Sequence, residues 1–167
     1  MMGYELYELL QKHWYVRSIF RGVYASDNLP VLMSGVPHAF ILNLDKQNQP
    51  GTHWCAIFIS PHGHLTYFDS FGLPPLVPSI QNFIRKNSLT FNYNRLIIQD
   101  VFSTTCGLYA VYFIERVCRG DHLNGILSVF KTYSTFYNDK MIIKLYRTRL
   151  IKLSHISFYT EQLLNKV

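Results

Sequence analysis

An apolar run that begins at Cys106 constrains the fold of this chain more than any other stretch. Between Cys106 and Cys118 the side chains are mostly apolar, and Gly120 follows shortly after. This pattern predicts a long buried helix over residues 106–118 that ends near Gly120. A chain of 167 residues, 49% of them hydrophobic, is long enough to surround such a helix with one hydrophobic core.

The segments upstream of this helix predict a β-hairpin. Residues 52–60 are expected to form a strand, and the continuous apolar run within them is typical of a strand that is buried on both faces. Residues 61–64 read Pro-His-Gly-His, a tight turn, and residues 65–70 return as the second strand. Further strands are expected over residues 38–44 and 93–99.

Several other segments have the spacing of short amphipathic helices. We expect helices over residues 4–12, 79–86, 122–131 and 138–151. The last of these would be capped by Asn138 or Asp139. The sequence has no internal repeat, low-complexity segment or linker, so we interpret residues 1–167 as a single domain.

The cysteines and the apolar runs indicate where such a protein would work. The three cysteines, Cys55, Cys106 and Cys118, are odd in number and form no CxxC pair. This pattern disfavours a disulfide scaffold and favours a reduced, intracellular compartment. No apolar run approaches the roughly 18 residues of a membrane span, so we expect no membrane partner.

The positive charge is concentrated in the last third of the chain. The whole chain has a formal net charge of +6, and all of this excess comes from residues 116–167. Lys140, Lys144 and Arg147 fall at i, i+4 and i+7 and form a basic stripe on the predicted helix. Two interpretations remain open: a solvated basic face, or a surface that binds nucleic acid or another polyanion.

Cys106 has the position of a nucleophile. A thiol attacks a carbonyl group as the thiolate, and free cysteine has a pKa of about 8.5. Thr104 or Thr105 could cap the helix, which would place the Cys106 sulfur beside unpaired N–H groups and the positive end of the helix dipole. Gly107 would let a substrate backbone pass close to the sulfur. The alternative is a small core cysteine on an apolar helix.

The predicted hairpin brings His53 and Asp69 together. His53 begins one strand and Asp69 closes the next, and such positions are neighbours in an antiparallel pair. The Asp69 carboxylate would fix the tautomer of the His53 ring, and the ring would act as the base for Cys106. Taken singly, His53 could be a surface histidine and Asp69 a turn residue.

Gln99 completes the predicted constellation. It stands at the end of the strand expected over residues 93–99, seven positions before Cys106. Its side-chain amide could donate to the oxyanion of a tetrahedral intermediate, together with the Cys106 backbone N–H. No single residue of the four indicates a function by itself, and the prediction depends on their combination.

In these motifs the chain resembles the adenovirus-type cysteine proteases (adenain), which are relatives of the SUMO-specific, ubiquitin-like proteases. The likeness covers roughly residues 14–118, and the order His, Asp or Glu, Gln, Cys-Gly is specific. It is carried by Phe20-Arg-Gly-Val-Tyr24, Pro37-His-Ala-Phe-Ile-Leu-Asn43, Gly-Thr-His53-Trp54, Tyr67-Phe-Asp69-Ser-Phe-Gly72, Gln99 and Cys106-Gly-Leu-Tyr-Ala-Val-Tyr-Phe.

The resemblance implies a fold, a set of roles and a biological setting. The fold is α+β, with a central, mostly antiparallel sheet between helices and the nucleophile at the start of a buried helix. His53 is implied as base, Asp69 as its orienting acid, Gln99 as oxyanion donor and Cys106 as nucleophile. The activity implied is an endopeptidase that cuts precursor proteins of a virus, or of a virus-like transposon, during virion maturation. We therefore expect a location in the host nucleus and the virion.

The resemblance also bears on cofactors and partners. Adenoviral enzymes are activated by DNA and by a viral peptide that is joined through a disulfide. The basic last third is compatible with double-stranded DNA as an activator, whereas residues 86–98 contain no cysteine that could receive the peptide. We expect a monomer that needs no obligatory cofactor and no metal, and that acts on precursor proteins.

Two alternatives follow from the same residues. The first is a protease that removes SUMO-like or ubiquitin-like modifiers, which would use the same constellation. The second is a non-catalytic, DNA-binding, capsid-associated protein that keeps the fold, which the basic excess in residues 116–167 would favour.

Overall fold

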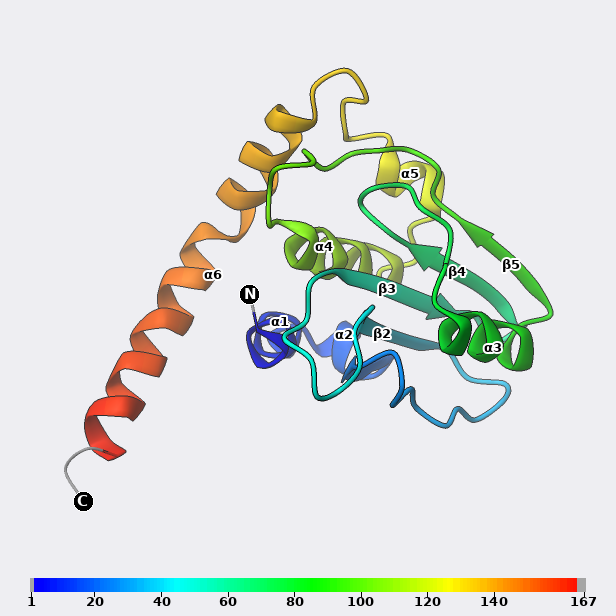
Figure 1. Cartoon of the computed structure of the whole chain (residues 1–167), viewed down its shortest axis with the longest axis horizontal. Helices are drawn as coiled ribbons and strands as arrows, with labels where there is room; N and C mark the ends of the chain where they lie inside the picture. Colours follow the sequence, from blue (N-terminus) through cyan, green and yellow to red (C-terminus); the bar gives the residue numbers. More distant parts are fainter. Residues whose placement is uncertain (1, 165–167) are drawn as a thin grey trace.

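A five-stranded mixed sheet forms the centre of the molecule (Figure 1). The structure is a computed structural model that describes the backbone of residues 2–164 and the side chains of residues 2–153. The strands are β1 (Phe20–Tyr24), β2 (His38–Asn43), β3 (Trp54–Ile59), β4 (His64–Phe68) and β5 (Thr90–Tyr93). The helices are α1 (Gly3–Leu10), α2 (Trp14–Arg17), α3 (Pro78–Asn87), α4 (Cys106–Cys118), α5 (Leu123–Leu127) and α6 (Thr135–Leu164).

The strands lie in the order in which they occur in the chain, from β1 to β5. The two central pairings, β2 with β3 and β3 with β4, are antiparallel as expected, and the two edge pairings are parallel. In the predicted hairpin Ala56 pairs with Phe68 and Ile59 with Leu65. This register confirms the hairpin and brings the start of β3 beside the end of β4.

Helices cover both faces of the sheet (Figure 1). On one face, α1 and α4 pack against alternate strand residues such as Ile41, Ala56 and Phe68. On the other face, α3 covers a second cluster that includes Cys55 and Tyr67. Side chains on both faces of β3 are therefore packed against helices, which is why the sequence of this strand is continuously apolar. The α+β fold with a sheet between helices is as predicted.

Helix α4 has the predicted bounds. It begins at Cys106, ends at Cys118, and is buried along most of its length. Gly120 follows with a φ of +95°, a conformation that glycine adopts without strain and that ends the helix. Strands β2 and β3 and helix α1 contact α4, so Cys106 at the start of this helix is held against the core.

Some expected elements have other bounds. The strand predicted over residues 93–99 is wrong, because β5 covers Thr90–Tyr93 and the buried side chain of Asn94 then bonds to the backbone of Asp69. Helix α5 is shorter than expected, and β1 was not predicted. The capping role of Asn138 or Asp139 is also wrong, because α6 begins earlier, at Thr135, and both side chains are buried.

Helix α6 begins at the body of the protein and extends away from it toward its C-terminal end (Figure 1). Tyr146 is buried and its hydroxyl donates to Glu115 of α4 at 2.8 Å, while Arg149 pairs with the same carboxylate. These contacts hold the middle of α6 against α4. Among the described residues, no helix combines the length and the apolar character that a membrane crossing requires.

Candidate active site

His53 and Asp69 meet at one end of the central hairpin. His53 directly precedes β3 and Asp69 directly follows β4, so the observed register places them side by side. The His53 Nε2 atom lies 2.9 Å from the Asp69 Oδ1 atom, and the carboxylate is 1% exposed. The structure thus brings together the imidazole and the carboxylate that the spacing had paired.

The backbone around Asp69 holds its carboxylate in place. Its Oδ1 atom also accepts from the Phe71 backbone N–H at 2.8 Å. The Asn94 side chain bonds to both the backbone N–H and the backbone carbonyl of Asp69, at 2.8 and 2.6 Å. The Phe71 ring stacks on the His53 ring with centroids 5.0 Å apart. Sequence analysis missed Asn94, since no local pattern connects it with a residue 25 positions away.

Gly72 allows this turn to pack closely. Its φ is +70°, and a Cβ atom there would come within 2.9 Å of backbone atoms of Arg95 and Leu96. A larger residue would therefore be strained and would push the turn away from the segment that leads to Gln99. Steric crowding thus explains why glycine occupies position 72 of this motif.

Cys106 lies at the start of α4 with 7% of its surface exposed. Burial is the largest single influence and raises the pKa of its thiol. The hydrogen bond with the His53 side chain, the Trp54 and Gly107 backbone amides and the charge of His53 together outweigh burial, so the pKa is lowered overall. The thiolate is the reactive form of cysteine, so this environment favours a nucleophile.

The pKa of the His53 imidazole is shifted in the opposite direction, upward. Burial lowers the pKa of its imidazole, but the hydrogen bonds with Asp69 and with the thiols of Cys106 and Cys55 raise it to about 12. Since Nε2 faces Asp69, Nδ1 is the ring nitrogen that remains for a thiol. The arrangement stabilises an imidazolium beside a thiolate, which is the state that attacks a carbonyl and then protonates a leaving amine.

The side chain of a second cysteine, Cys55, also lies close to the His53 imidazole. It is fully buried, its sulfur accepts from the Tyr67 hydroxyl at 3.1 Å, and burial raises its pKa to about 11. In the described part of the chain, one group of three potential metal ligands gathers, with donor atoms of His53, Cys55 and Asp69 within 4.8 Å of one another. Hydrogen bonds account for these approaches, so we assign no metal. Sequence analysis gave Cys55 no role.

Gln99 lies in the loop that leads to α4 and not at the end of a strand, because β5 ends at Tyr93. The side chain is 1% exposed. Its Oε1 atom accepts from the Ser70 hydroxyl at 2.6 Å, and its Nε2 atom donates to the Ser103 carbonyl at 3.0 Å. An amide NH₂ group has two hydrogens, so one remains for another acceptor. The bond to Ser70 ties Gln99 to the neighbour of Asp69.

The predicted helix cap has a different form. Thr105 occupies the N-cap position of α4, but its hydroxyl donates to Asp139 of α6 at 3.0 Å and makes no capping bond. The first backbone N–H groups of α4 are therefore not taken by a threonine side chain. One of them, from Gly107, bonds to the Cys106 thiol instead.

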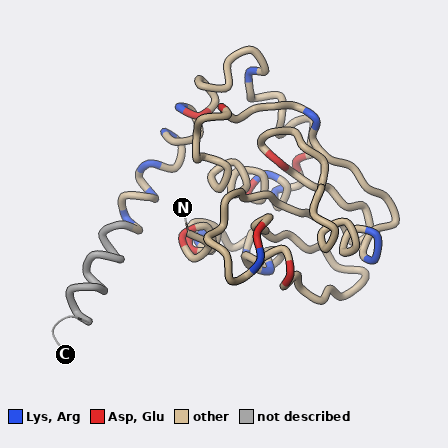
Figure 2. Tube along the Cα trace, in the orientation of Figure 1, with Lys and Arg blue, Asp and Glu red and all other residues tan. Residues whose placement is uncertain are grey.

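Lys140, Lys144 and Arg147 are exposed on α6. Figure 2 shows basic positions along the described part of this helix. The Lys140 ammonium lies 4.4 Å from the centroid of the Phe136 ring, which is also exposed. The structure thus presents these three cations to solvent along one helix.

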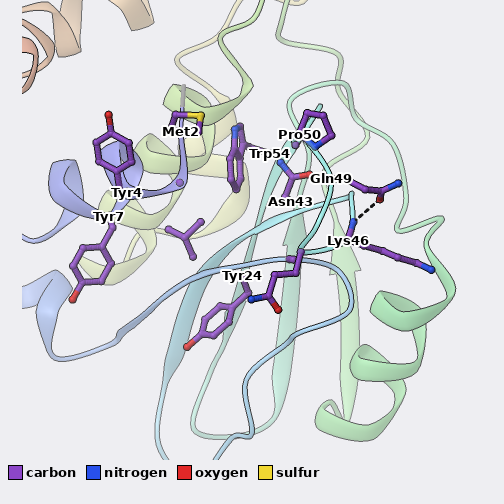
Figure 3. A pocket seen from close by; sticks show the side chains of 14 residues that line it. Met2, Tyr4, Tyr7, Tyr24, Asn43, Lys46, Gln49, Pro50 and Trp54 are labelled. Carbon is purple, nitrogen blue, oxygen red and sulfur yellow. Dashed lines mark hydrogen bonds between the residues drawn. The ribbon is translucent and has the colours of Figure 1, made fainter. Parts of the chain in front are cut away.

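A pocket of about 420 Å³ lies beside Trp54 (Figure 3). The Trp54 backbone contacts the Cys106 thiol, and its ring forms one wall of the pocket. Figure 3 shows Tyr4 and Tyr7 of α1 on one side and the loop with Lys46 and Pro50 on the other. The lining therefore combines four aromatic side chains, Tyr4, Tyr7, Tyr24 and Trp54, with polar residues of the loop.

One buried polar atom at this pocket has no partner. Asn43 is 5% exposed; its Oδ1 atom accepts from the Asp45 backbone, but its Nδ2 atom has no hydrogen-bond partner. Gly51, at a φ of +82°, lies next to it, and a Cβ atom there would come within 2.8 Å of Nδ2. The absence of a side chain at position 51 therefore lets the loop pack closely over this buried amide.

A comparison with curated proteins gives one relative. A protein of Acanthamoeba polyphaga mimivirus, named "Putative thiol protease", is 36% identical to this chain over 101 residues. The match takes in 54% of this chain and 33% of the relative, so the chain spans about a third of the length of the protein it matches. No family model matches the chain. The likeness does not single out the adenovirus branch.

Solved structures give weaker likenesses. The crystal structure of the ASFV protease has a TM-score of 0.46 and 22% identity, over 61% of this chain and 42% of that chain. The crystal structure of the de-sumoylating protease has a TM-score of 0.40 and 16% identity, over 98% of this chain and 74% of that chain. Both TM-scores are below 0.5, so neither likeness bears on activity.

Proposed function

We propose that this chain is a cysteine endopeptidase with Cys106 as nucleophile, His53 as base and acid, and Asp69 as the group that orients His53. One observation carries the proposal. The Cys106 thiol lies at the start of α4 beside the His53 imidazole, which lowers the pKa of the thiol, and the Nε2 atom of that imidazole lies 2.9 Å from a buried carboxylate. The mimivirus relative, which is named as a thiol protease, supports the same class of activity.

The reaction would follow the chemistry of these groups. The Cys106 thiolate attacks the carbonyl carbon of a peptide bond, and the oxygen becomes an oxyanion. The free N–H of Gln99 and the Cys106 backbone N–H would donate to that oxygen. The His53 imidazolium gives its proton to the leaving amine, which leaves a thioester. Water, deprotonated by His53, then attacks the thioester and releases the acid and the thiol.

The pocket beside Trp54 supports a peptide as substrate. An extended peptide carries a carbonyl on every residue, and the pocket lining includes the donor side chains of Lys46, Gln47 and Gln49. The aromatic walls suit an apolar side chain of the same peptide. We further propose viral precursor proteins as substrates, which the viral source of the relative supports.

The test is peptide cleavage with matched cysteine variants. Wild type and Cys118→Ala should both cleave members of a Gly-containing peptide library, and Cys106→Ala should cleave none. Equal cleavage by Cys106→Ala and wild type would contradict the proposal. Ubiquitin-like modifiers with a C-terminal electrophile are a parallel probe, and rapid labelling of Cys106 by these alone would favour a modifier protease.

The exposed cations of α6 favour a second function beside catalysis, the binding of DNA or another polyanion. Lys140, Lys144 and Arg147 lie within two turns of one helix and are all exposed. Their ammonium and guanidinium groups would contact phosphates and carry no sequence preference. The same stripe would serve a non-catalytic, capsid-associated protein, and the Cys106→Ala experiment separates that case from a peptidase.

A further inference from the structure

Residues 98–105, here called the 98–105 segment, connect the two ends of the proposed oxyanion site. The segment contains Gln99 and ends beside Cys106, but it forms neither helix nor strand. Its middle faces solvent, with Phe102 95% exposed. A segment of this kind needs contacts from elsewhere in the fold to hold Gln99 and Cys106 at a fixed separation.

Asp139 of α6 supplies contacts to both ends of this segment. Its Oδ1 atom accepts from the Thr105 hydroxyl at 3.0 Å, and its Oδ2 atom accepts from the Asp100 backbone N–H at 3.3 Å. Thr105 directly precedes Cys106, and Asp100 directly follows Gln99. One carboxylate therefore bridges the neighbours of both proposed reactive groups.

The residue before it makes a parallel set of bonds. Asn138 is fully buried, and its Nδ2 atom donates to the Ile98 carbonyl at 3.0 Å and to the Lys131 carbonyl at 2.8 Å. The Tyr109 hydroxyl of α4 lies 2.8 Å from Asp139 Oδ1 and 3.0 Å from the Ile98 carbonyl. Helix α6, the 98–105 segment and α4 thus share one buried polar network.

A carboxylate is an unfavourable choice for packing alone. Asp139 is 4% exposed, and among the described residues no cation pairs with it. A buried charge is tolerated only when hydrogen bonds replace the water that it has lost. Here the donors come from the 98–105 segment and from α4, so the charge is satisfied only while that segment keeps its conformation.

We infer that Asp139 is a positioning residue for the proposed peptidase, and this inference rests on that proposed function. It holds the 98–105 segment so that the Gln99 amide and the Cys106 N–H face the same oxyanion. Asp139 itself touches neither substrate nor reacting atoms. The start of α6, which lies beyond the part of the chain that carries the family resemblance, is therefore part of the scaffold of the active site.

The test compares Asp139→Asn with a matched variant of α6. In Asp139→Asn, a side-chain amide keeps one acceptor for Thr105 but presents N–H groups to the Asp100 N–H. Tyr146→Phe removes another buried hydrogen bond of α6, to Glu115, at a site that does not touch the 98–105 segment. Both variants weaken the contact of α6 with the body of the protein, but only the first alters the segment.

We expect Asp139→Asn to lower kcat by about 10- to 100-fold, since a misplacement of about 1 Å can cost that much. KM and the alkylation rate of Cys106 should change little, because His53 and Asp69 are untouched. Tyr146→Phe should keep the wild-type kcat. Hydrogen exchange over residues 98–105 should become faster in Asp139→Asn alone. Thr105→Ser, which keeps the hydroxyl, should retain kcat, whereas Thr105→Val should lose part of it.

Two results would overturn the inference. The first is a wild-type kcat in Asp139→Asn. The second is an equal loss of kcat in Asp139→Asn and Tyr146→Phe when the two variants have the same thermal stability. If the wild-type protein cleaves no peptide, the proposed function fails separately. Hydrogen exchange then still decides the structural part, because unchanged protection of residues 98–105 in Asp139→Asn would show that the carboxylate does not hold the segment.

Discussion

The two ends of α4 each carry a cysteine, and the two thiols have opposite properties. Cys106 begins the helix and Cys118 ends it, and both are largely buried. Burial raises the pKa of Cys118 to about 12, whereas the hydrogen bonds of Cys106 lower its pKa in spite of burial. The helix dipole also differs, with its positive end at Cys106. The contrast teaches that hydrogen-bond partners and position on the helix, rather than residue type or burial, set the two thiol pKa values apart.

Removal of the His53 imidazole should have the largest effect on the difference in reactivity between Cys106 and Cys118. His53→Ala takes away the strongest of the influences that lower the Cys106 pKa, so Cys106 should become a buried thiol similar to Cys118. We expect peptide cleavage to fall by about 10²–10⁴-fold, the usual contribution of a general base. Alkylation of Cys106 at neutral pH should fall toward the rate of Cys118. An unchanged Cys106 rate would show that His53 does not activate the thiol.

Removal of the oxyanion donor should separate thiol reactivity from catalysis. Gln99→Ala should lower cleavage by about 10²–10³-fold in kcat, as for other single oxyanion donors. The alkylation rate of Cys106 should stay near wild type, because Gln99 does not contribute to its pKa. Thermal unfolding of the variant is the control for the lost bonds to Ser70 and Ser103. Equal losses in alkylation and in cleavage would contradict a role in the oxyanion site.

The pH dependence of alkylation should sharpen the contrast further. A lowered pKa means that the Cys106 thiolate forms at a pH where an ordinary thiol, with a pKa of about 8.5, is still protonated. The Cys106 rate should therefore rise through a lower midpoint than that of an unperturbed thiol and then level off. With a His53 pKa of about 12, the imidazolium persists through this range and no alkaline decline is expected. The Cys118 rate should still be rising at pH 10, and a shared midpoint would refute the contrast.

The smallest effect on the contrast should come from α6. Neutralisation of Lys140, Lys144 and Arg147 to glutamine should weaken DNA binding and reduce the dependence of its logarithm on log salt by up to about 2.7, which is 0.9 for each charge. The ratio of Cys106 to Cys118 alkylation should not change, since these side chains face solvent. Unaltered DNA binding in the triple variant would exclude the stripe as the binding surface.

The local patterns of the sequence predicted the parts of the site that depend on regular structure. The apolar run placed α4 at Cys106–Cys118, and the hairpin register placed His53 beside Asp69. Both predictions succeed because helix and strand periodicity is a property of neighbouring residues. The roles proposed for these residues stay predictions until activity is measured.

The parts that could not be predicted depend on contacts between distant residues. Asn94 ends β5 early because its side chain bonds to Asp69, 25 positions away. Asp139 has the composition of a helix cap, but the fold buries it against Thr105, 34 positions away. Polar side chains carry no periodic signal of their partners, so only the folded structure shows these pairs.

One measurement tests the central claim most directly: the site of the covalent intermediate during peptide turnover. The reaction would be stopped with acid, and a protease digest would be analysed by mass spectrometry. We predict that the acyl group of the substrate is found on the fragment between Arg95 and Arg116, whose one cysteine is Cys106. An acyl group on Cys55 or Cys118, or rapid turnover with no acylated cysteine, would contradict the account.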